Sequence, residues 1–359
     1  MNSISDWHTL SQAWPYVCKK PEVELAFKQR PEDFKVTEIL PFTPIGEGEH
    51  WWLYIKKTRS HTAEVAKALA RFVGVSYRDV AYSGLKDYFA ETWQWFSVYL
   101  PSGKQIEWTK FKLAGAQVIE VCKHNKKLRR RTHCRNAFEI RLNYQAIAQN
   151  SQLRGTLENT LKRIKVQGVP NYFGQQRFGR NMSNLDNATA FFQKPGRTSK
   201  RLNDRQAMWV SAARAWLFNT VLAERVKDKS WNKLRLHEPC NLNTTQSYFV
   251  SSIEDDLETR LANGDIHPTA PMWGVLSSRD HDLFNHAKDC LEIELEYLSG
   301  FKELRHGLEG LNLPYKRRTT RCIPSSVRWH FEENSLLLRF ELLPGQYATS
   351  VLRELTSVS

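Results

Sequence analysis

Residues 138–164 read FEIRLNYQAIAQNSQLRGTLENTLKRI, and this stretch decides the class of fold. From Phe138 to Leu142 apolar and polar side chains alternate, which predicts a strand with one buried face. From Leu153 to Ile164 the pattern is typical of a helix instead. The chain therefore changes from strands to helices near Asn150.

Strands dominate the region before this change. We expect extended segments at residues 24–40, 52–55, 80–82 and 92–100. The clearest early helix spans residues 62–73, where the apolar side chains form one stripe and Gly74 supplies a stop.

Helices dominate the region after the change, until strands return near the end. We expect a helix at 207–226, an acidic and helix-rich stretch at 255–304, a strand at 335–342 and a terminal helix at 348–355. This order, from strands to helices and back, predicts an α+β domain interrupted by an inserted domain.

The charge of the chain indicates a polyanionic partner. The 359 residues include 52 Lys and Arg against 38 Asp and Glu, a net charge of +14. Residues 236–300 are acidic, whereas basic runs lie at 123–135, 194–201 and 316–321. A single run is usually a solvated surface, but three runs and a separate acidic stretch favour a surface that binds RNA.

Several classes of protein are disfavoured. The longest apolar runs fall far short of the roughly 20 residues that a membrane helix needs, and residues 1–8 do not resemble a secretory signal. Six cysteines without a CxxC pair are typical of reduced thiols in a cytoplasmic protein. We therefore expect a cytoplasmic protein with no membrane partner.

Motifs for metals and cofactors are absent from the sequence. Cys122, His124, His133 and Cys134 lie close together, but their spacing fits no standard zinc signature and seven basic side chains share the stretch. No phosphate loop, dinucleotide fingerprint or nucleophile elbow is present. We expect neither a metal nor a cofactor.

One loop could carry chemistry. Residues 83–87, SGLKD, lie between a short apolar run and an aromatic-rich strand, so Asp87 could project into a cleft. A surface turn with a solvated aspartate fits the same residues, and the pattern alone does not single out Asp87.

A resemblance to a known family separates these alternatives. Seven blocks are similar to the TruD family of tRNA pseudouridine synthases and follow the order of that family: RPEDF at 30–34, GEGEH at 46–50, SGLKD at 83–87, HNKKLR at 124–129 leading to NAF at 136–138, GVPNYFGQQRFG at 168–179, WVSAAR at 209–214 and YATSVLREL at 347–355. The resemblance implies a discontinuous pseudouridine synthase domain with a mixed β-sheet at 1–165 and 312–359. It also implies a helix-rich, family-specific domain inserted at 166–311.

The resemblance implies that the protein isomerises uridine in tRNA, at position 13 in bacterial enzymes. Asp87 matches the catalytic aspartate, which either attacks C1′ or removes a ribose proton. Lys28 matches its basic partner, whose positive charge favours the ionised carboxylate. A catalytically silent RNA-binding or RNA-folding protein on the same scaffold is the alternative.

The resemblance also assigns residues that contact the substrate. Phe138 matches a phenylalanine that stacks on the target uracil, although the strand pattern also fits core packing. Asn136 suits the imide edge of uracil because it both donates and accepts hydrogen bonds. Phe34 and Tyr347 match two further aromatic residues that line the substrate.

The basic residues would bind RNA phosphates without reading sequence; they are Lys126, Lys127, Arg129 and Arg130. Two departures affect selectivity more than reaction type. Residues 131–135 read RTHCR where the family usually has glycines, and Tyr347 stands where phenylalanine is common. We expect the protein to act as a monomer.

Overall fold

The computed structural model describes residues 7–100, 105–194, 196, 202–243, 247–252 and 256–357. The chain forms two compact units. One consists of Val23–Asn159 and Pro324–Gln346, and is called the sheet unit here. The other consists of Met1–Glu22, Thr160–Ile323 and Tyr347–Ser359, and is called the helical unit.

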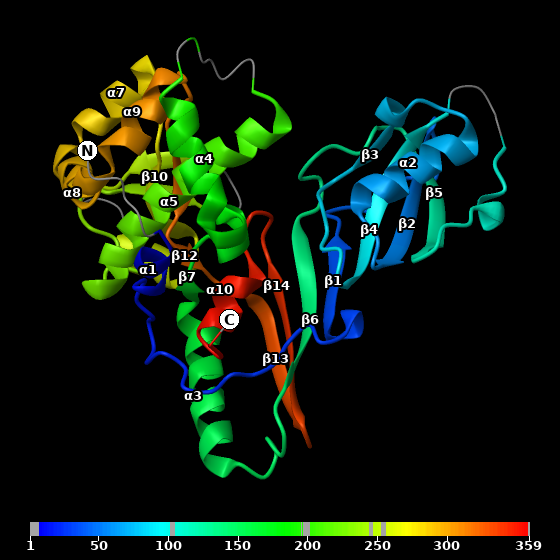
Figure 1. The fold of residues 1–359 in the computed structure, drawn as a ribbon, viewed down its shortest axis with the longest axis horizontal. Helices are drawn as coiled ribbons and strands as arrows, with labels where there is room; N and C mark the ends of the chain where they lie inside the picture. Colours follow the sequence, from blue (N-terminus) through cyan, green and yellow to red (C-terminus); the bar gives the residue numbers. More distant parts are fainter. Residues whose placement is uncertain are drawn as a thin grey trace. The chain divides into compact units, whose positions relative to one another are not determined.

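The sheet unit is built on one mixed eight-stranded sheet (Figure 1). Its strands are β1 (Phe34–Ile39), β2 (His50–Thr58), β3 (Val80–Tyr82), β4 (Glu91–Tyr99), β5 (Ala116–His124), β6 (Arg135–Asn143), β13 (Ser325–Glu332) and β14 (Ser335–Leu342). They lie in the order β13-β14-β6-β1-β4-β2-β5, with β3 paired to β4. β1 and β4 run parallel, and the other pairs are antiparallel.

Helix α2 (Thr62–Val73) covers part of this sheet, as its apolar stripe predicts (Figure 1). Val65 and Leu69 are fully buried on that stripe, in a core with residues of β2 and β4. The helix ends at Gly74, whose positive φ of 75° lets its N–H donate to the Ala70 carbonyl at 3.0 Å.

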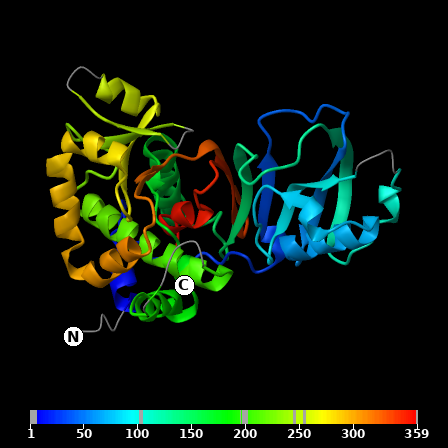
Figure 2. The same cartoon turned by 90° about the horizontal axis from the view of Figure 1, so that it is seen from above.

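The helical unit packs around one long central helix, α5 (Asp204–Lys227). The other helices in this part of the chain are α1 (Trp7–Gln12), α4 (Ser183–Phe192), α6 (Leu257–Ala262), α7 (Ser278–Asn285), α8 (Lys288–Tyr297), α9 (Lys302–Gly310) and α10 (Ala348–Arg353). Figure 2 shows α8 and α9 (orange) beside α5 (green). Trp216 of α5 is 1% exposed and meets Trp7 edge to face at 5.0 Å.

Two small sheets complete the helical unit. Strands β8 (Pro239–Leu242), β9 (Tyr248–Val250), β10 (Ile266–Met272) and β11 (Lys316–Thr319) form one, and β7 (Val169–Pro170) and β12 (Arg321–Cys322) form the other. β10 lies within the stretch that we expected to be helix-rich. Its two prolines argue against an internal strand in sequence, yet it pairs with both β8 and β11.

The α+β class with a mixed sheet is confirmed, but the compact units are divided differently from the expected domains. Residues 1–22, 160–165, 312–323 and 347–359 belong to the helical unit, and the division falls within α3 (Ser151–Gln167). The functional bounds 1–165 with 312–359, and 166–311, stay a prediction. In the described ranges, no helix is both long and apolar enough to cross a bilayer.

Candidate active site

The loop at residues 83–87 is held rigidly between β3 and β4. Its backbone is fixed by four hydrogen bonds: Arg131 N to the Ser83 carbonyl at 2.9 Å, Gln94 Nε2 to the Gly84 carbonyl at 3.2 Å, Lys86 N to Thr62 Oγ1 at 3.1 Å, and Lys57 Nζ to the Asp87 carbonyl at 2.8 Å. These donors and acceptors come from α2, β2, β4 and the segment before β6. The loop is therefore pre-organised by the sheet unit itself.

The side chain of Lys86 points into the protein. Its Nζ lies 2.6 Å from Oε1 of Glu38, and the two side chains are 7% and 0% exposed. The second oxygen of Glu38 accepts a hydrogen bond from Trp95 N at 3.1 Å. Burial raises the pKa of Glu38, and the ammonium of Lys86 opposes this rise. The ion pair therefore anchors the loop to β1 and β4.

His133 adds a second buried anchor. Its ring nitrogen Nδ1 is hydrogen-bonded to Ser83 Oγ, which also accepts from His133 N at 3.1 Å. Burial, followed by the nearby charge of Lys86, lowers the pKa of His133 to about 4. The imidazole is thus neutral at neutral pH, as two cations beside one buried carboxylate would otherwise repel each other.

Lys57 holds the same loop through a buried hydrogen bond. It is fully buried, and its ammonium donates to the carbonyls of Ser60 and Asp87. Burial lowers the pKa of Lys57 to about 8, while the charge of Asp87 acts in the opposite direction. A buried ammonium is costly unless it is hydrogen-bonded, so these two carbonyls account for its presence.

Asp87 points out of the loop, in contrast to its neighbour. Its carboxylate accepts a hydrogen bond from Lys28 Nζ at 2.7 Å, and the side chains are 48% and 26% exposed. Lys28 has a positive φ of 54°, and its ammonium lies 4.0 Å from the centre of the Phe34 ring. The structure thus joins two residues 59 positions apart into an accessible ion pair over an aromatic ring.

Phe34, Asn136 and Phe138 share the sheet face next to this pair. Asn136 and Phe138 alternate with the strand period on β6, opposite Glu38 and Val36 of β1. Phe138 meets Phe34 edge to face at 6.0 Å and stacks on Phe340 at 5.3 Å. Oδ1 of Asn136 is buried without a hydrogen-bond partner among the described residues. A buried amide oxygen without a partner is energetically costly, and a hydrogen bond from a bound base would offset this cost.

The basic run from Lys126 to Arg130 presents its charges to solvent. All four cationic side chains in it are exposed, whereas Leu128 between them is buried and its N–H donates to Ser97 Oγ at 3.0 Å. The backbone at Gly48 packs closely against the residues just before this run, because a Cβ at Gly48 would lie 2.5 Å from the His124 carbonyl oxygen. The buried Leu128 therefore holds the run against the sheet unit, while its four charged side chains stay exposed to solvent. Residues 197–201 of the second basic run lie outside the described residues.

Tyr347 belongs to the helical unit, unlike the other five predicted substrate and catalytic residues. There its hydroxyl accepts a hydrogen bond from Arg177, and its ring lies 5.8 Å from that of Phe173. The structure therefore groups Lys28, Asp87 and three of the predicted substrate residues in one unit, and it gives Tyr347 a separate set of contacts.

Sequence reasoning missed the buried supports of the loop. A signal for Glu38 was present, since Phe34, Val36 and Glu38 alternate on one face of β1 and a carboxylate among buried apolar residues needs a partner. Lys57 carries no comparable signal. No group of three or more potential metal ligands occurs in the ranges that the structure describes, including the cysteines and histidines near residue 130.

Comparisons with known proteins agree over nearly the whole chain. A family model described as tRNA pseudouridine synthase D (TruD) matches residues 12–188 and 198–355. The tRNA pseudouridine synthase D of Nitrosococcus oceani is 39% identical over 350 residues, which cover 96% of this chain and 93% of that protein. That of Idiomarina loihiensis is 37% identical over 343 residues, covering 95% and 93%.

A solved structure shows the same fold. The crystal structure of the putative tRNA pseudouridine synthase D from Methanosarcina mazei superimposes with a TM-score of 0.70 and covers 96% of both chains. Its sequence identity is 19%, so this likeness concerns the fold alone.

Proposed function

Since the chain belongs to the family of tRNA pseudouridine synthases D, we propose that it converts uridine in tRNA to pseudouridine. The reaction breaks the N1–C1′ bond and forms a C5–C1′ bond. The proton that leaves C5 is balanced by the one that N1 gains, so substrate and product are isomers. The enzyme needs a carboxylate, a means of holding the detached base and access to a base within folded RNA.

The ion pair of Asp87 and Lys28 is the observation that carries this proposal. The carboxylate is half exposed, so a ribose can reach it, and the backbone that bears it is fixed by buried groups. Asp87 either attacks C1′ or removes a ribose proton, and both routes use a negatively charged carboxylate. The ammonium of Lys28 donates a hydrogen bond to this carboxylate at 2.7 Å. The isomerisation step is thereby assigned to the sheet unit.

The neighbouring residues would hold the base. We assign stacking on the uracil to Phe138, with Phe34 as a second aromatic wall, and hydrogen bonding to the imide edge to Asn136. The buried, unpartnered Oδ1 of Asn136 supports this role. We also propose that Tyr347 contacts the substrate. The exposed cations at 126, 127, 129 and 130 would bind phosphates.

The proposal also covers the position of the modified uridine, the oligomeric state and location of the enzyme, and its need for a cofactor or metal. We place the modified uridine at position 13 of tRNA and expect a monomeric, cytoplasmic enzyme that works without cofactor or metal. Full activity in EDTA would support the last point, whereas restoration of lost activity by Mg²⁺ or Zn²⁺ would contradict it. Light scattering of the free protein measures its oligomeric state.

Incubation with an unmodified tRNA transcript tests the function directly. Carbodiimide-reactive pseudouridine should form, and mapping of the modified residue should place it at position 13. A protein that binds the transcript but forms no pseudouridine would instead be an RNA-binding or RNA-folding protein. Modification at another uridine would keep the reaction and correct the position.

A further inference from the structure

The helical unit contains a polar cavity that includes Tyr347, and the other residues that line it have no assigned role. Its volume is about 150 Å³, and it is lined by Gly174, Gln176, Arg177, Asn184, Met208 and Tyr347. The polar side chains among these are two amides, a guanidinium and a phenol. None of the six is a carboxylate, so the cavity carries positive charge.

The guanidinium of Arg177 is held in place by neutral groups. It donates to Ser211 Oγ at 3.3 Å and to the hydroxyl of Tyr347, and its centre lies 5.6 Å from the Phe173 ring. Arginine has five N–H donors, and within the described ranges no carboxylate pairs with Arg177. Its charge is therefore oriented but not neutralised.

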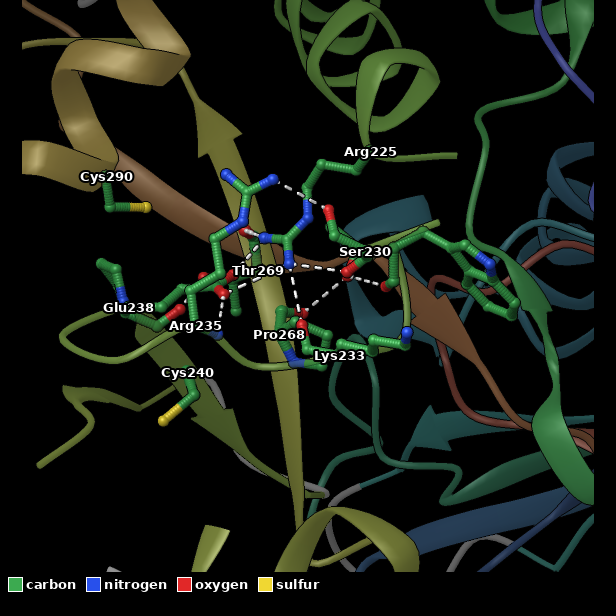
Figure 3. Close-up of polar contacts among 12 residues, drawn as sticks. Arg225, Ser230, Lys233, Arg235, Glu238, Cys240, Pro268, Thr269 and Cys290 are labelled. Atoms are coloured by element: carbon green, nitrogen blue, oxygen red, sulfur yellow. Dashed lines mark hydrogen bonds and ion pairs between the residues drawn. The ribbon is translucent and has the colours of Figure 1, made fainter. Parts of the chain in front are cut away.

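Two buried arginines of the same unit provide a contrast to the half-buried Arg177. Arg225 pairs with the buried carboxylate of Glu238 and also donates to the carbonyls of Ser230 and Lys233 at 2.8 and 2.9 Å (Figure 3). Arg317 forms a two-pronged pair with Glu294 at 2.6 and 2.7 Å. These arginines act as structural links, because each is matched by a buried anion. Arg177 lacks that match.

A second cation lies beside the first. The guanidinium centre of Arg318 is 4.1 Å from the same Phe173 ring and 5.8 Å from the ring of Tyr347. Burial lowers the pKa of Arg318 to about 10, and the charge of Arg177 acts in the same direction. The guanidinium of Arg318 donates to the carbonyl and Oδ1 of Asn171 at 3.3 and 2.7 Å, so it adds positive charge near the cavity from a fixed position.

We propose that the cavity at Arg177 binds a backbone phosphate of the RNA substrate, an inference that rests on the proposed function. A guanidinium matches two phosphate oxygens at once, and the exposed amide of Gln176 offers a further donor. The hydroxyl of Tyr347 orients Arg177, which a phenylalanine at this position could not do. The helical unit thereby contributes to RNA binding without reading sequence.

Salt-dependent binding of a tRNA transcript tests this site. The measurements use Asp87→Asn protein, so that turnover does not interfere, with Arg177→Gln as the test and Arg180→Gln as the matched control. Arg180 is exposed, lies three residues away and does not line the cavity. We expect Arg177→Gln to weaken binding roughly tenfold at 0.1 M KCl and to reduce the slope of log K against log[KCl] by about one. The control should leave the slope unchanged.

Arg177→Lys separates charge from packing. A lysine keeps one positive charge but loses the two-pronged geometry, so the slope should stay near that of the parent while affinity falls by a smaller factor. Equal slopes for Arg177→Gln and Arg180→Gln would overturn the proposal, as would a lysine variant that loses the slope as fully as the glutamine variant. A protein that forms no pseudouridine would overturn the function but not this binding comparison.

Discussion

Lys86 and Asp87 are neighbours on one loop, yet their side chains belong to opposite environments. Lys86 turns inward to a carboxylate that is 0% exposed, whereas Asp87 turns outward to an ammonium that is 26% exposed. A buried ion pair contributes by fixing geometry, because its removal leaves an unmatched charge. An exposed pair contributes little to stability but leaves its carboxylate available for reaction. The loop thus separates anchoring from chemistry within two residues.

Replacement of Asp87 by Asn tests the outward side chain and should have the largest effect on activity. Only the negative charge is lost, so we expect isomerisation to fall by about 10³-fold or more while tRNA affinity and thermal stability stay close to wild type. Single-turnover kinetics with a tRNA transcript measure the rate, and filter binding measures the affinity. A variant with near wild-type turnover would remove Asp87 from the proposed mechanism.

Replacement of Glu38 by Gln tests the buried ion pair between Lys86 and Glu38. It leaves the ammonium of Lys86 buried without its carboxylate, which should cost about 3–5 kcal/mol in the free energy of unfolding. Glu139→Gln is the matched control, since Glu139 pairs on the sheet surface with Lys35 and Arg339 and should cost about 1 kcal/mol or less. Denaturant titrations measure both; equal losses would show that burial does not distinguish the two pairs.

The neutral His133 predicts a sensitivity of the sheet unit to acid. Its pKa is about 4 in the folded protein, whereas the unfolded chain takes up this proton near the ordinary value of 6.5. The unfolded state binds more protons between these values, so stability falls as the pH drops through this window. The loss from pH 7 to pH 5 is about 2 kcal/mol.

His133→Gln removes this titration and should reduce the loss of stability between pH 7 and pH 5. Hydrogen exchange of amides in β4 at the two pH values, corrected for intrinsic exchange rates, measures the change. The facing groups are Lys86, Glu38 and Ser83, and of these Glu38 also titrates in acid. Burial raises the pKa of Glu38, so its protonation would stabilise the folded state as the pH falls. If wild type and variant lose the same protection, His133 is not the source of the acid sensitivity.

Phe138→Leu tests the aromatic face beside the outward pair. Loss of the stacking ring should lower kcat by about ten- to a hundredfold with little change in tRNA affinity. Phe340→Leu is the matched control because Phe340 stacks on Phe138 and is 2% exposed, so it alters packing without a proposed substrate contact. If the control slowed turnover as much, Phe138 would act through packing.

The smallest effect is expected from the exposed charges. Changing Lys126, Lys127, Arg129 and Arg130 to Gln should reduce the salt slope of tRNA binding by about one unit per lost phosphate contact, without changing the rate of bound substrate. Lys67→Gln with Arg71→Gln, on the exposed side of α2, is the control. An unchanged slope in the fourfold variant would show that this run does not contact the RNA phosphates.

Local pattern predicted the elements well, and it predicted long-range pairing poorly. The helix at 62–73 and the strand at 335–342 have the bounds that periodicity and a glycine stop indicate. The partnership of Lys28 with Asp87 came from the family resemblance alone. Lys28 lies outside a strand with a positive φ, where no periodicity applies. Partners such as Glu38 and Lys86 depend on which strands become neighbours, and a single pattern does not specify that choice.

The strand order of the large sheet has a consequence for biosynthesis. β6 pairs on one side with β1, about a hundred residues earlier, and on the other with β14, which is made almost two hundred residues later. During translation one edge of β6 stays open until most of the helical unit has emerged from the ribosome. Open strand edges are templates for aggregation. The nascent chain is therefore most vulnerable in this interval, and chaperone contacts should concentrate there.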